Sequence, residues 1–331
     1  MVPDGARFDF VVVGGGTAGN TVAGRLAETA GVSVLIVEAG AGNPQDVAEI
    51  MTPSSAMDLR GSQYDWAYKS TIVRRDDYER IEKPNTRGKV LGGSSALNYF
   101  TWVPGCRATF DGWREFAGDE WTWERLLPYL RKSATYHDDD GLFSPDLAKV
   151  GAGAGPVHWH YPVPRGGSYT TVVVDLVRPV SAPGTVTLRS ADAREQPDIN
   201  LNFFADDLDI VAMREGIRFS YDVLTKGDGF CDVVEAEYPW DMALDSDADM
   251  KRAVLDRCQT AFHPCGTARL SRSVEQGVVD ARLRVHGVAG LRVVDASVIP
   301  VIPDCRIQNS VYMVGEKAAD MIKEDFPVLF G

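Results

Sequence analysis

The chain has 331 residues, enough for two domains of about 150 residues each. Hydrophobic residues make up 44% and charged residues 24%, the composition of an ordinary soluble globular protein. Lys and Arg total 34 against 47 Asp and Glu, so the net charge is −13, and such a chain repels the phosphates of nucleic acids and anionic membranes. We therefore expect neither nucleic acid nor a membrane as a partner.

The N-terminal residues lead directly into an apolar run, with no basic segment or small-residue cleavage site before it. All apolar runs are far shorter than the roughly 20 residues that span a bilayer. We therefore expect a cytoplasmic protein without a secretory signal. The odd number of cysteines and the absence of a Cys-x-x-Cys pair favour reduced thiols over disulfides or a zinc site. These cysteines are Cys106, Cys231, Cys258, Cys265 and Cys305.

The first predicted element is a strand over residues 8–13, whose continuous apolar character predicts burial on both faces. It ends in a glycine-rich turn, residues 14–19, which matches G-x-G-x-x-G. Residues 20–30 then repeat apolar side chains at helical spacing, and a second predicted strand, 32–37, ends at Glu38. This order is typical of the first unit of a Rossmann-like α/β domain that binds a dinucleotide.

Each residue of this motif has a structural role that requires its type. Gly14 makes the tight turn, Gly16 lets the backbone approach a pyrophosphate, and Gly19 lets the helix pack closely on the strand. The start of the helix offers N–H groups and the positive end of its dipole to phosphates. Glu38 can accept hydrogen bonds from both ribose hydroxyls, and it would repel a 2′-phosphate. The motif alone fits FAD and NAD equally well.

In the middle of the chain, residues 138–168 contain the glycine and aspartate runs of a loop or linker. Strands are predicted over 171–177 and 185–188, and helices over 209–224 and 248–258. A last helix is predicted to begin near Asn309 and Ser310, which are good N-cap types. Its apolar side chains form one stripe at helical spacing. They are Val311, Val314, Ala318, Met321 and Ile322.

Several further blocks carry a family resemblance. They are residues 87–99 (RGKVLGGSSALNY), 262–268 (FHPCGTA), 277–280 (GVVD), 290–300 (GLRVVDASVIP) and 315–322 (GEKAADMI). In this order, after the first glycine turn, they resemble the glucose-methanol-choline family of FAD oxidoreductases. The resemblance covers roughly residues 7–133 and 170–325. This resemblance indicates that the predicted dinucleotide cofactor is FAD rather than NAD.

The resemblance implies an α/β fold: a Rossmann-like FAD-binding domain, residues 1–135 and 258–331, and a substrate domain, residues 136–257. The substrate domain would hold a reduced, mainly antiparallel β-sheet plus helices. The predicted cofactor-binding residues lie in the two glycine turns, after the second strand, and around the last helix. They are Gly14, Gly16, Thr17, Ala18, Gly19, Glu38, Ala39, Leu91, Gly92, Gly93, Ser94, Asn98, Tyr99, Asp295, Ala296, Gln308 and Asn309.

The resemblance also implies two catalytic positions. The histidine of the His-Pro-x-Gly-Thr block is His263, and the second position, normally His or Asn, is Arg306 here. Arginine stays protonated, so Arg306 cannot act as the base that deprotonates an alcohol. It can instead bind a carboxylate through two parallel N–H donors, which suggests a small anionic substrate. The alternative interpretation is a surface ion pair of Arg306, for example with Asp304.

The His/Arg pair and residues 304–312 (DCRIQNSVY) resemble the formate-oxidising members of the family. That resemblance implies that formate and O2 give CO2 and hydrogen peroxide by hydride transfer to flavin N5, with FAD in some members as its 8-formyl derivative. Three alternatives stay open: an alcohol oxidase or dehydrogenase, a non-redox lyase, and an inactive remnant on the same fold.

Family members are longer by more than a third, and their additional segment would be inserted between about residues 134 and 170 of this chain. A compact form that bridges the gap and a truncated chain that cannot close its site both fit this difference. We expect no metal site, since His158 and His160 have no third ligand nearby. Cys265 and Cys305 are expected to be inert buried thiols. The sequence leaves open whether the chain forms a homo-oligomer.

Overall fold

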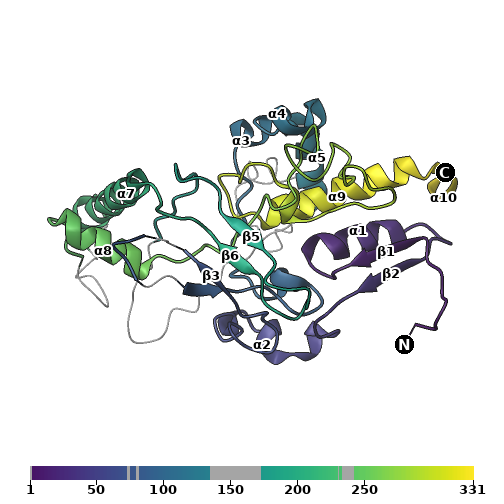
Figure 1. The fold of residues 1–331 in the computed structure, drawn as a ribbon, viewed down its shortest axis with the longest axis horizontal. Helices are drawn as coiled ribbons and strands as arrows, with labels where there is room; N and C mark the ends of the chain where they lie inside the picture. Colours follow the sequence, from purple (N-terminus) through teal and green to yellow (C-terminus); the bar gives the residue numbers. More distant parts are fainter. Residues whose placement is uncertain (1, 73–74, 80–81, 135–172, 230, 233–241) are drawn as a thin grey trace. The chain divides into compact units, whose positions relative to one another are not determined.

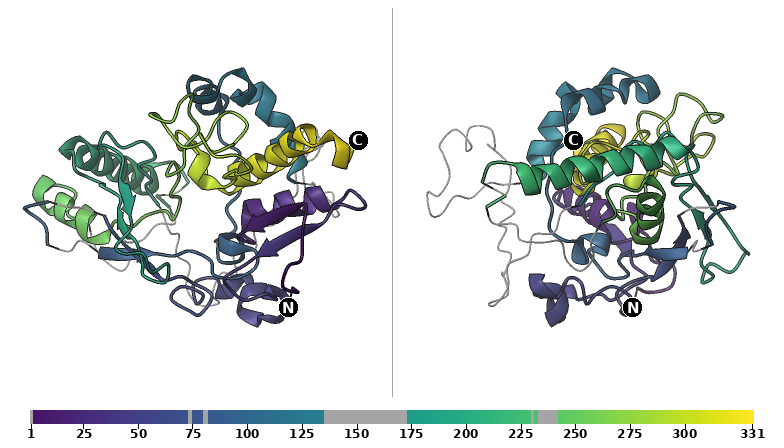
Figure 2. Two further views of the ribbon diagram at one scale, coloured as in Figure 1. Left: turned by 45° about the vertical axis from the view of Figure 1, so that its right-hand side comes forward. Right: turned by 90° about the vertical axis from the view of Figure 1, so that its left-hand side faces the viewer.

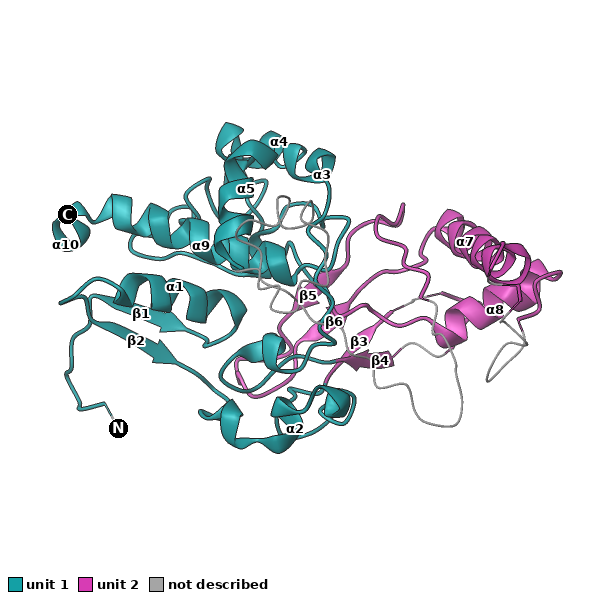
Figure 3. Ribbon diagram, turned by 180° about the vertical axis from the view of Figure 1, so that it is seen from behind, with its two compact units in different colours: residues 1–67, 86–162, 263–331 teal, residues 68–85, 163–262 magenta. Residues whose placement is uncertain are grey.

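The computed structural model describes residues 2–72, 75–79, 82–134, 173–229, 231–232 and 242–331. The chain divides into two compact units (Figure 3): unit 1 is drawn from residues 1–67, 86–162 and 263–331, and unit 2 from 68–85 and 163–262. The predicted domain boundaries placed residues 68–85 with the FAD-binding part, whereas these residues group with unit 2. The assignment of the units to cofactor and substrate stays a prediction.

Unit 1 begins with the α/β unit that the sequence predicts. Strands β1 (Phe10–Val13) and β2 (Val34–Val37) pair in parallel, with Phe10 opposite Val34. Helix α1 (Thr17–Ala27) connects them and lies between this sheet and helix α9 (Gln308–Asp325), as Figures 1 and 2 show. Two elements that are far apart in sequence, α1 and α9, therefore pack side by side.

The sheet of unit 1 differs from the prediction in one respect. Val12 faces α1, since its Cγ1 lies 3.3 Å from the position that a Cβ on Gly19 would take. Val11 and Val13 point to the opposite face and are 57% and 84% exposed. The prediction of burial on both faces is wrong, because side chains of a strand alternate between faces and α1 covers only one of them.

Helix α9 supplies much of the core of unit 1. All five residues of its predicted apolar stripe are at most 8% exposed. Four of them, all but Val311, belong to one core cluster with residues of α1 and with buried aromatic residues such as Trp113 and Trp121. The helix begins at Gln308, earlier than predicted, and no side chain caps it. Asn309 lies in the first turn instead, where its side-chain oxygen accepts a hydrogen bond from the Ser310 N–H (2.6 Å).

The other elements of unit 1 are short helices. They are η1 (Pro44–Asp46), α2 (Ala48–Met51), η2 (Pro53–Ser55), η3 (Gly93–Ala96), α3 (Arg107–Asp111), α4 (Arg114–Ala117), η4 (Asp119–Trp121), α5 (Trp123–Lys132), η5 (Ala296–Val298) and α10 (Pro327–Phe330). Among the described residues, no helix is both long and apolar enough to cross a membrane.

Unit 2 contains a four-stranded sheet in the order β4-β3-β6-β5. The β3–β4 and β5–β6 pairs are antiparallel and the β3–β6 pair is parallel, so the sheet is mainly antiparallel, as predicted. Residues 173–177 are not a strand, although the sequence predicts one there. The strands are β3 (Tyr68–Thr71), β4 (Glu82–Asn85), β5 (Thr185–Thr187) and β6 (Asp198–Asn200).

The two predicted helices of unit 2 are confirmed as α7 (Asp207–Lys226) and α8 (Asp247–Arg257), which lie side by side (Figure 2). The ammonium of Lys83 is buried and donates to the carbonyls of Leu255, Asp256 and Cys258 at 3.0, 2.7 and 2.7 Å. A cation at the last carbonyls of α8 compensates the negative end of the helix dipole. The predicted linker, 138–168, lies outside the described residues.

Candidate functional site

The first glycine turn has the backbone that the motif demands. Gly14 has φ of +99°, in the left-handed region that favours glycine. A Cβ on Gly19 would lie 2.0 Å from the carbonyl oxygen of Gly14, so only glycine fits there. Gly16 is the N-cap of α1 and leaves that end without a side-chain cap. The start of α1, with Thr17 and Ala18, therefore keeps its N–H groups and positive dipole end available for an anion.

The second glycine turn packs directly on the first. The N–H of Gly92 donates to the carbonyl of Gly15 at 2.7 Å. A Cβ on Gly93, whose φ is +56°, would lie 2.7 Å from the Cα of Gly16. Leu91 fills the space above Gly15, where its Cδ1 is 2.5 Å from the position of a Cβ. The two predicted cofactor segments therefore meet backbone to backbone.

Glu38 ends β2 beside the first glycine turn. One of its carboxylate oxygens accepts from the N–H of Gly15 and the other from the N–H of Gly40, both at 2.8 Å. Each carboxylate oxygen has two acceptor sites, so Glu38 retains acceptor capacity for ribose hydroxyls. Ala39, between Glu38 and Gly40 in the sequence, is exposed and carries no side-chain polar group.

One hydroxyl, that of Ser95, joins three segments of unit 1. Its oxygen lies 2.6 Å from the Thr17 hydroxyl oxygen and accepts a hydrogen bond from the Gln308 side-chain amide at 3.2 Å. The start of α1, the second glycine turn and the start of α9 therefore converge on one atom. Sequence reasoning missed Ser95, because in the Gly-Gly-Ser-Ser turn only the fold decides which hydroxyl points toward the helices.

Other residues of the predicted cofactor set hold the backbone in place. The side chain of Asn98 donates to the Ser95 carbonyl (2.9 Å) and accepts from the Phe100 N–H (2.7 Å). The Tyr99 hydroxyl accepts from Arg60, whose guanidinium carbon lies 4.9 Å from the centroid of the Tyr99 ring. Burial raises the pKa of Tyr99. No sequence signal pointed to Arg60.

Two predicted positions have mainly local contacts. The hydroxyl of Ser94, an exposed residue, accepts from the Gly88 N–H at 3.2 Å within the second glycine turn. Asn309 is buried, and its amide donates to the carbonyl of Val103. Asn309 therefore fixes the start of α9 on the loop before α3.

The segment that carries His263 runs beside η5. The N–H groups of Ala268 and Leu270 donate to the carbonyls of Ser297 and Val298, both at 2.9 Å. Asp295 caps η5, since its side chain accepts from the Ser297 N–H at 2.8 Å, so this carboxylate supports the turn that contains Ala296. His263 itself is partly buried.

Arg306 lies two residues before α9 and is also partly buried. Its neighbour Asp304 accepts from the backbone N–H of Cys106 at 3.1 Å. Hydrogen bonds from the thiol and backbone of Cys106 and from Thr109 lower the pKa of Asp304 to about 2. Asp304 thus anchors the Arg306 loop to the start of α3. The roles of His263 and Arg306 stay a prediction.

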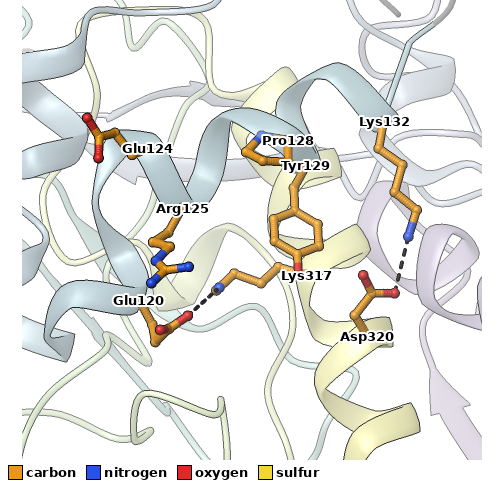
Figure 4. Close-up of a pocket in the computed structure, with 8 residues that line it drawn as sticks. All are labelled: Glu120, Glu124, Arg125, Pro128, Tyr129, Lys132, Lys317 and Asp320. Atoms are coloured by element: carbon orange, nitrogen blue, oxygen red, sulfur yellow. Dashed lines mark hydrogen bonds and ion pairs between the residues drawn. The ribbon is translucent and has the colours of Figure 1, made fainter.

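A pocket of ≈ 340 Å³ lies between α5 and α9, and it contains none of the predicted site residues (Figure 4). Its lining is Glu120, Glu124, Arg125, Pro128, Tyr129, Lys132, Lys317 and Asp320. The side chain of Lys317 is 4% exposed, and its ammonium lies 3.7 Å from Glu120 and 5.1 Å from the ring centroid of Tyr129. The pocket is lined by ion pairs, and one of them, Lys132–Asp320, joins the two helices.

No group of three or more His, Cys, Asp or Glu within the described ranges could hold a metal ion. His158 and His160, the pair considered in the sequence, lie outside those ranges.

The candidate cofactor site is built from two glycine turns and two helix starts. Two helix starts without a side-chain cap, glycine turns in backbone contact and a carboxylate with spare acceptors fit the diphosphate and ribose of FAD.

Comparison with known proteins agrees with this geometry. Two family models described as GMC oxidoreductase match residues 8–187 and 179–315. Oxygen-dependent choline dehydrogenase from Pseudomonas putida is 42% identical over 154 residues, 44% of this chain and 27% of that protein. Glucose oxidase-like protein fsoC from Humicola fuscoatra is 33% identical over 198 residues, 56% of this chain and 32% of that protein. The matched part thus spans about a quarter to a third of these relatives.

Solved structures of formate oxidase, including an arginine variant of the Aspergillus oryzae enzyme, are 42% identical, with a TM-score of 0.92. The matches cover 99% of this chain and 100% of those chains. Pyridoxine 4-oxidase from Mesorbium loti, 18% identical with a TM-score of 0.73, shares the fold. FAD is the expected cofactor, and the chain belongs to the glucose-methanol-choline (GMC) oxidoreductase family.

Proposed function

We propose that the chain is an FAD-dependent oxidase of a small carboxylate, which converts formate and O2 to CO2 and hydrogen peroxide. The observation that carries the proposal is the position of Arg306, two residues before α9. The first residue of this helix, Gln308, is hydrogen-bonded to Ser95, and Ser95 is hydrogen-bonded to Thr17 in the first glycine turn. A permanent cation at the edge of a dinucleotide site suits an anionic substrate. The 42% identity to formate oxidase supports formate as that anion.

Arg306 would bind and orient the substrate. Its guanidinium can donate two parallel hydrogen bonds to the two oxygens of formate, which fixes the direction of the C–H bond. Formate is already an anion at neutral pH, so no base has to remove a proton before the hydride leaves. A residue that cannot act as a base is therefore sufficient at this position. When bound, FAD supplies the hydride acceptor.

The cofactor would be held by the parts described above. The diphosphate would lie at the start of α1, with Gly16 and Gly93 in close backbone contact beneath it, and Glu38 would accept from the ribose. The start of α9 would direct its positive dipole end toward the flavin, where negative charge develops on reduction. His263 would donate a hydrogen bond to a substrate oxygen. Since the net charge of −13 repels anions, the attraction of formate has to be local.

The test is formate-dependent oxygen uptake and peroxide release by the purified chain and by two Arg306 variants. We expect activity in the wild-type chain, none in Arg306→Ala, and a weaker but measurable rate in Arg306→Lys, which keeps the charge and loses the two-pronged geometry. Peroxide release from primary alcohols but not from formate would overturn the proposal.

A second candidate function is alcohol oxidation, which the matches to a choline dehydrogenase and a glucose oxidase-like protein favour. It needs a base for the alcohol proton, and His263 would have to supply it. In that case His263→Ala would abolish alcohol turnover, while Arg306→Ala would leave it measurable. The same oxygen-uptake assay with methanol, choline and formate separates the two functions.

A further inference from the structure

The pocket between α5 and α9 has a cationic end and an apolar wall, and the proposed function uses neither (Figure 4). The residues from α5 are spaced three and four positions apart, so they share one face of that helix. They include Arg125, Pro128 and Tyr129, and they lie opposite Lys317 of α9. The pocket therefore combines side chains from two helices that are far apart in the sequence.

The ammonium of Lys317 is buried but only weakly compensated. The Lys317 side chain is 4% exposed, and its ion pair among the described residues is with Glu120, at 3.7 Å, beyond the usual hydrogen-bond distance. The rings of Trp121 and Tyr129 face the ammonium, with centroids 5.6 and 5.1 Å away. Burial lowers the pKa of Lys317, so its positive charge carries a desolvation cost that a closer anion would offset. The Glu120 side chain is 62% exposed, so a ligand can displace it into water.

Arg125 supplies a second cation at the end of the pocket where Lys317 lies (Figure 4). Its guanidinium is exposed, and within the described ranges it forms no ion pair. Glu124, the carboxylate next to it in the sequence, lies 3.7 Å from Arg107 instead. A guanidinium without a carboxylate partner, next to a buried ammonium, gives this end of the pocket the charge and the donors that an anion requires.

The size and the remaining wall of the pocket restrict the kind of anion. Its volume of ≈ 340 Å³ is at the lower end of the range for small-molecule sites, about 300–1,000 Å³. The rings of Pro128 and Tyr129 form an apolar surface beside the two cations. A ligand with an apolar body would remove this surface from water, which an inorganic anion cannot do.

We propose that the pocket between α5 and α9 binds a small organic carboxylate with an aromatic or other apolar body. The carboxylate would accept two parallel hydrogen bonds from the guanidinium of Arg125 and a further one from the ammonium of Lys317, in place of Glu120. The body of the ligand would pack on the rings of Pro128 and Tyr129. Because Arg306 does not line this pocket, the inference is independent of the proposed function.

The test titrates para-fluorobenzoate into the full chain as purified and follows the fluorine NMR signal of the probe. We expect saturable broadening at millimolar concentrations, and a dissociation constant at least about tenfold higher in Arg125→Gln, since this variant loses the charge-assisted hydrogen bonds. Arg131→Gln is the matched control, because Arg131 is an exposed arginine of the same helix that does not line the pocket. No saturable broadening, or equal losses in the two variants, would overturn the inference.

A second pair of variants tests the displacement of Glu120. We expect Glu120→Gln to lower the dissociation constant of the probe about twofold to fivefold, because the ligand no longer competes with a carboxylate for Lys317. Glu115→Gln removes the same charge from an exposed residue outside the pocket and should leave the constant unchanged. An equal gain in both variants would reflect net charge alone and would contradict the site.

Two further measurements separate this pocket from the predicted substrate site and from general anion binding. Arg306→Ala should bind the probe as the wild-type chain does, and a loss of binding in that variant would overturn the inference. Unlabelled benzoate should displace the probe at far lower concentration than inorganic phosphate, and equal displacement by phosphate would rule out the apolar wall. A chain that binds the probe but releases no peroxide from formate retains this inference and loses the proposed function.

Discussion

Arg25 and Glu316 form a two-pronged ion pair between α1 and α9: Nε donates to Oε2 at 2.7 Å and Nη2 donates to Oε1 at 2.8 Å. Glu316 is 4% exposed, whereas the Arg25 side chain is 30% exposed. The pair joins α1, the helix that follows the first glycine turn, to α9, the helix that begins two residues after Arg306. Glu316 is the buried partner, so loss of Arg25 leaves its carboxylate with Lys132, 3.4 Å away, as the remaining cation.

We expect Arg25→Met to lower the free energy of unfolding by roughly 1–3 kcal/mol, since it leaves a buried carboxylate with fewer donors. The measurement is urea unfolding followed by circular dichroism. Arg194→Met is the matched control, because Arg194 is 90% exposed in its pair with Asp192. That variant should change stability by about 0–1 kcal/mol. Equal losses in the two variants would show that the buried pair has no special role.

Gly93→Ala should prevent FAD binding. The new Cβ would lie 2.7 Å from the Cα of Gly16, and the residue would have to keep a φ of +56°. The two glycine turns would have to separate, so we expect a purified chain with less than a tenth of the wild-type ratio of flavin to protein absorbance. Gly24→Ala is the control: it lies inside α1 with nothing within 4 Å of the new methyl group. That variant should retain flavin and gain about 0.5–1 kcal/mol of stability.

Ser95→Ala should weaken the cofactor site without unfolding the chain. The substitution removes the acceptor and donor that join Thr17 to Gln308, at a net cost of about 0.5–1.5 kcal/mol. We expect the FAD dissociation constant, measured by flavin fluorescence, to rise about threefold to tenfold. Ser95→Thr should recover part of the affinity. Ser133→Ala, which loses a hydroxyl at the end of α5, should not change it; an unchanged constant in Ser95→Ala would contradict the role of this hydroxyl.

The local α/β unit and the glycine positions were predictable, since a tight turn and a close backbone approach exclude every residue but glycine. The stripe of α9 was predictable for the same kind of reason, because burial repeats with the helical period. The exposure of Val13 was not predictable, since it depends on what covers the second face of the sheet. Nor was the position of Ser95, because only the pairing of α1 with α9 shows which hydroxyl lies between them.

Acid should weaken the anchor of the Arg306 loop. The donors from Cys106 and Thr109 hold the pKa of Asp304 at about 2, below its usual 3.8. A carboxyl group with a lowered folded-state pKa stabilises the chain above the unfolded-state value, and this contribution disappears as the pH falls through the folded-state value. The stability advantage of the wild-type chain over Asp304→Asn should therefore be complete above pH 4 and vanish near pH 2.

The measurement is a series of urea unfolding curves for both chains between these pH values. Asp245→Asn, at an exposed aspartate in unit 2, controls for the general effect of removing one negative charge. A difference between the wild-type chain and Asp304→Asn that stays constant with pH would show that the anchor does not depend on the ionised carboxylate.

The most direct test of the central claim is the visible absorption spectrum of the purified chain before and after formate is added without oxygen. A flavin band that is present at the start and bleaches with formate is the predicted result, and Arg306→Ala should carry the same band and leave it unbleached. A chain that carries no flavin, or whose flavin band formate leaves unchanged, would contradict the assignment of this chain as a formate oxidase.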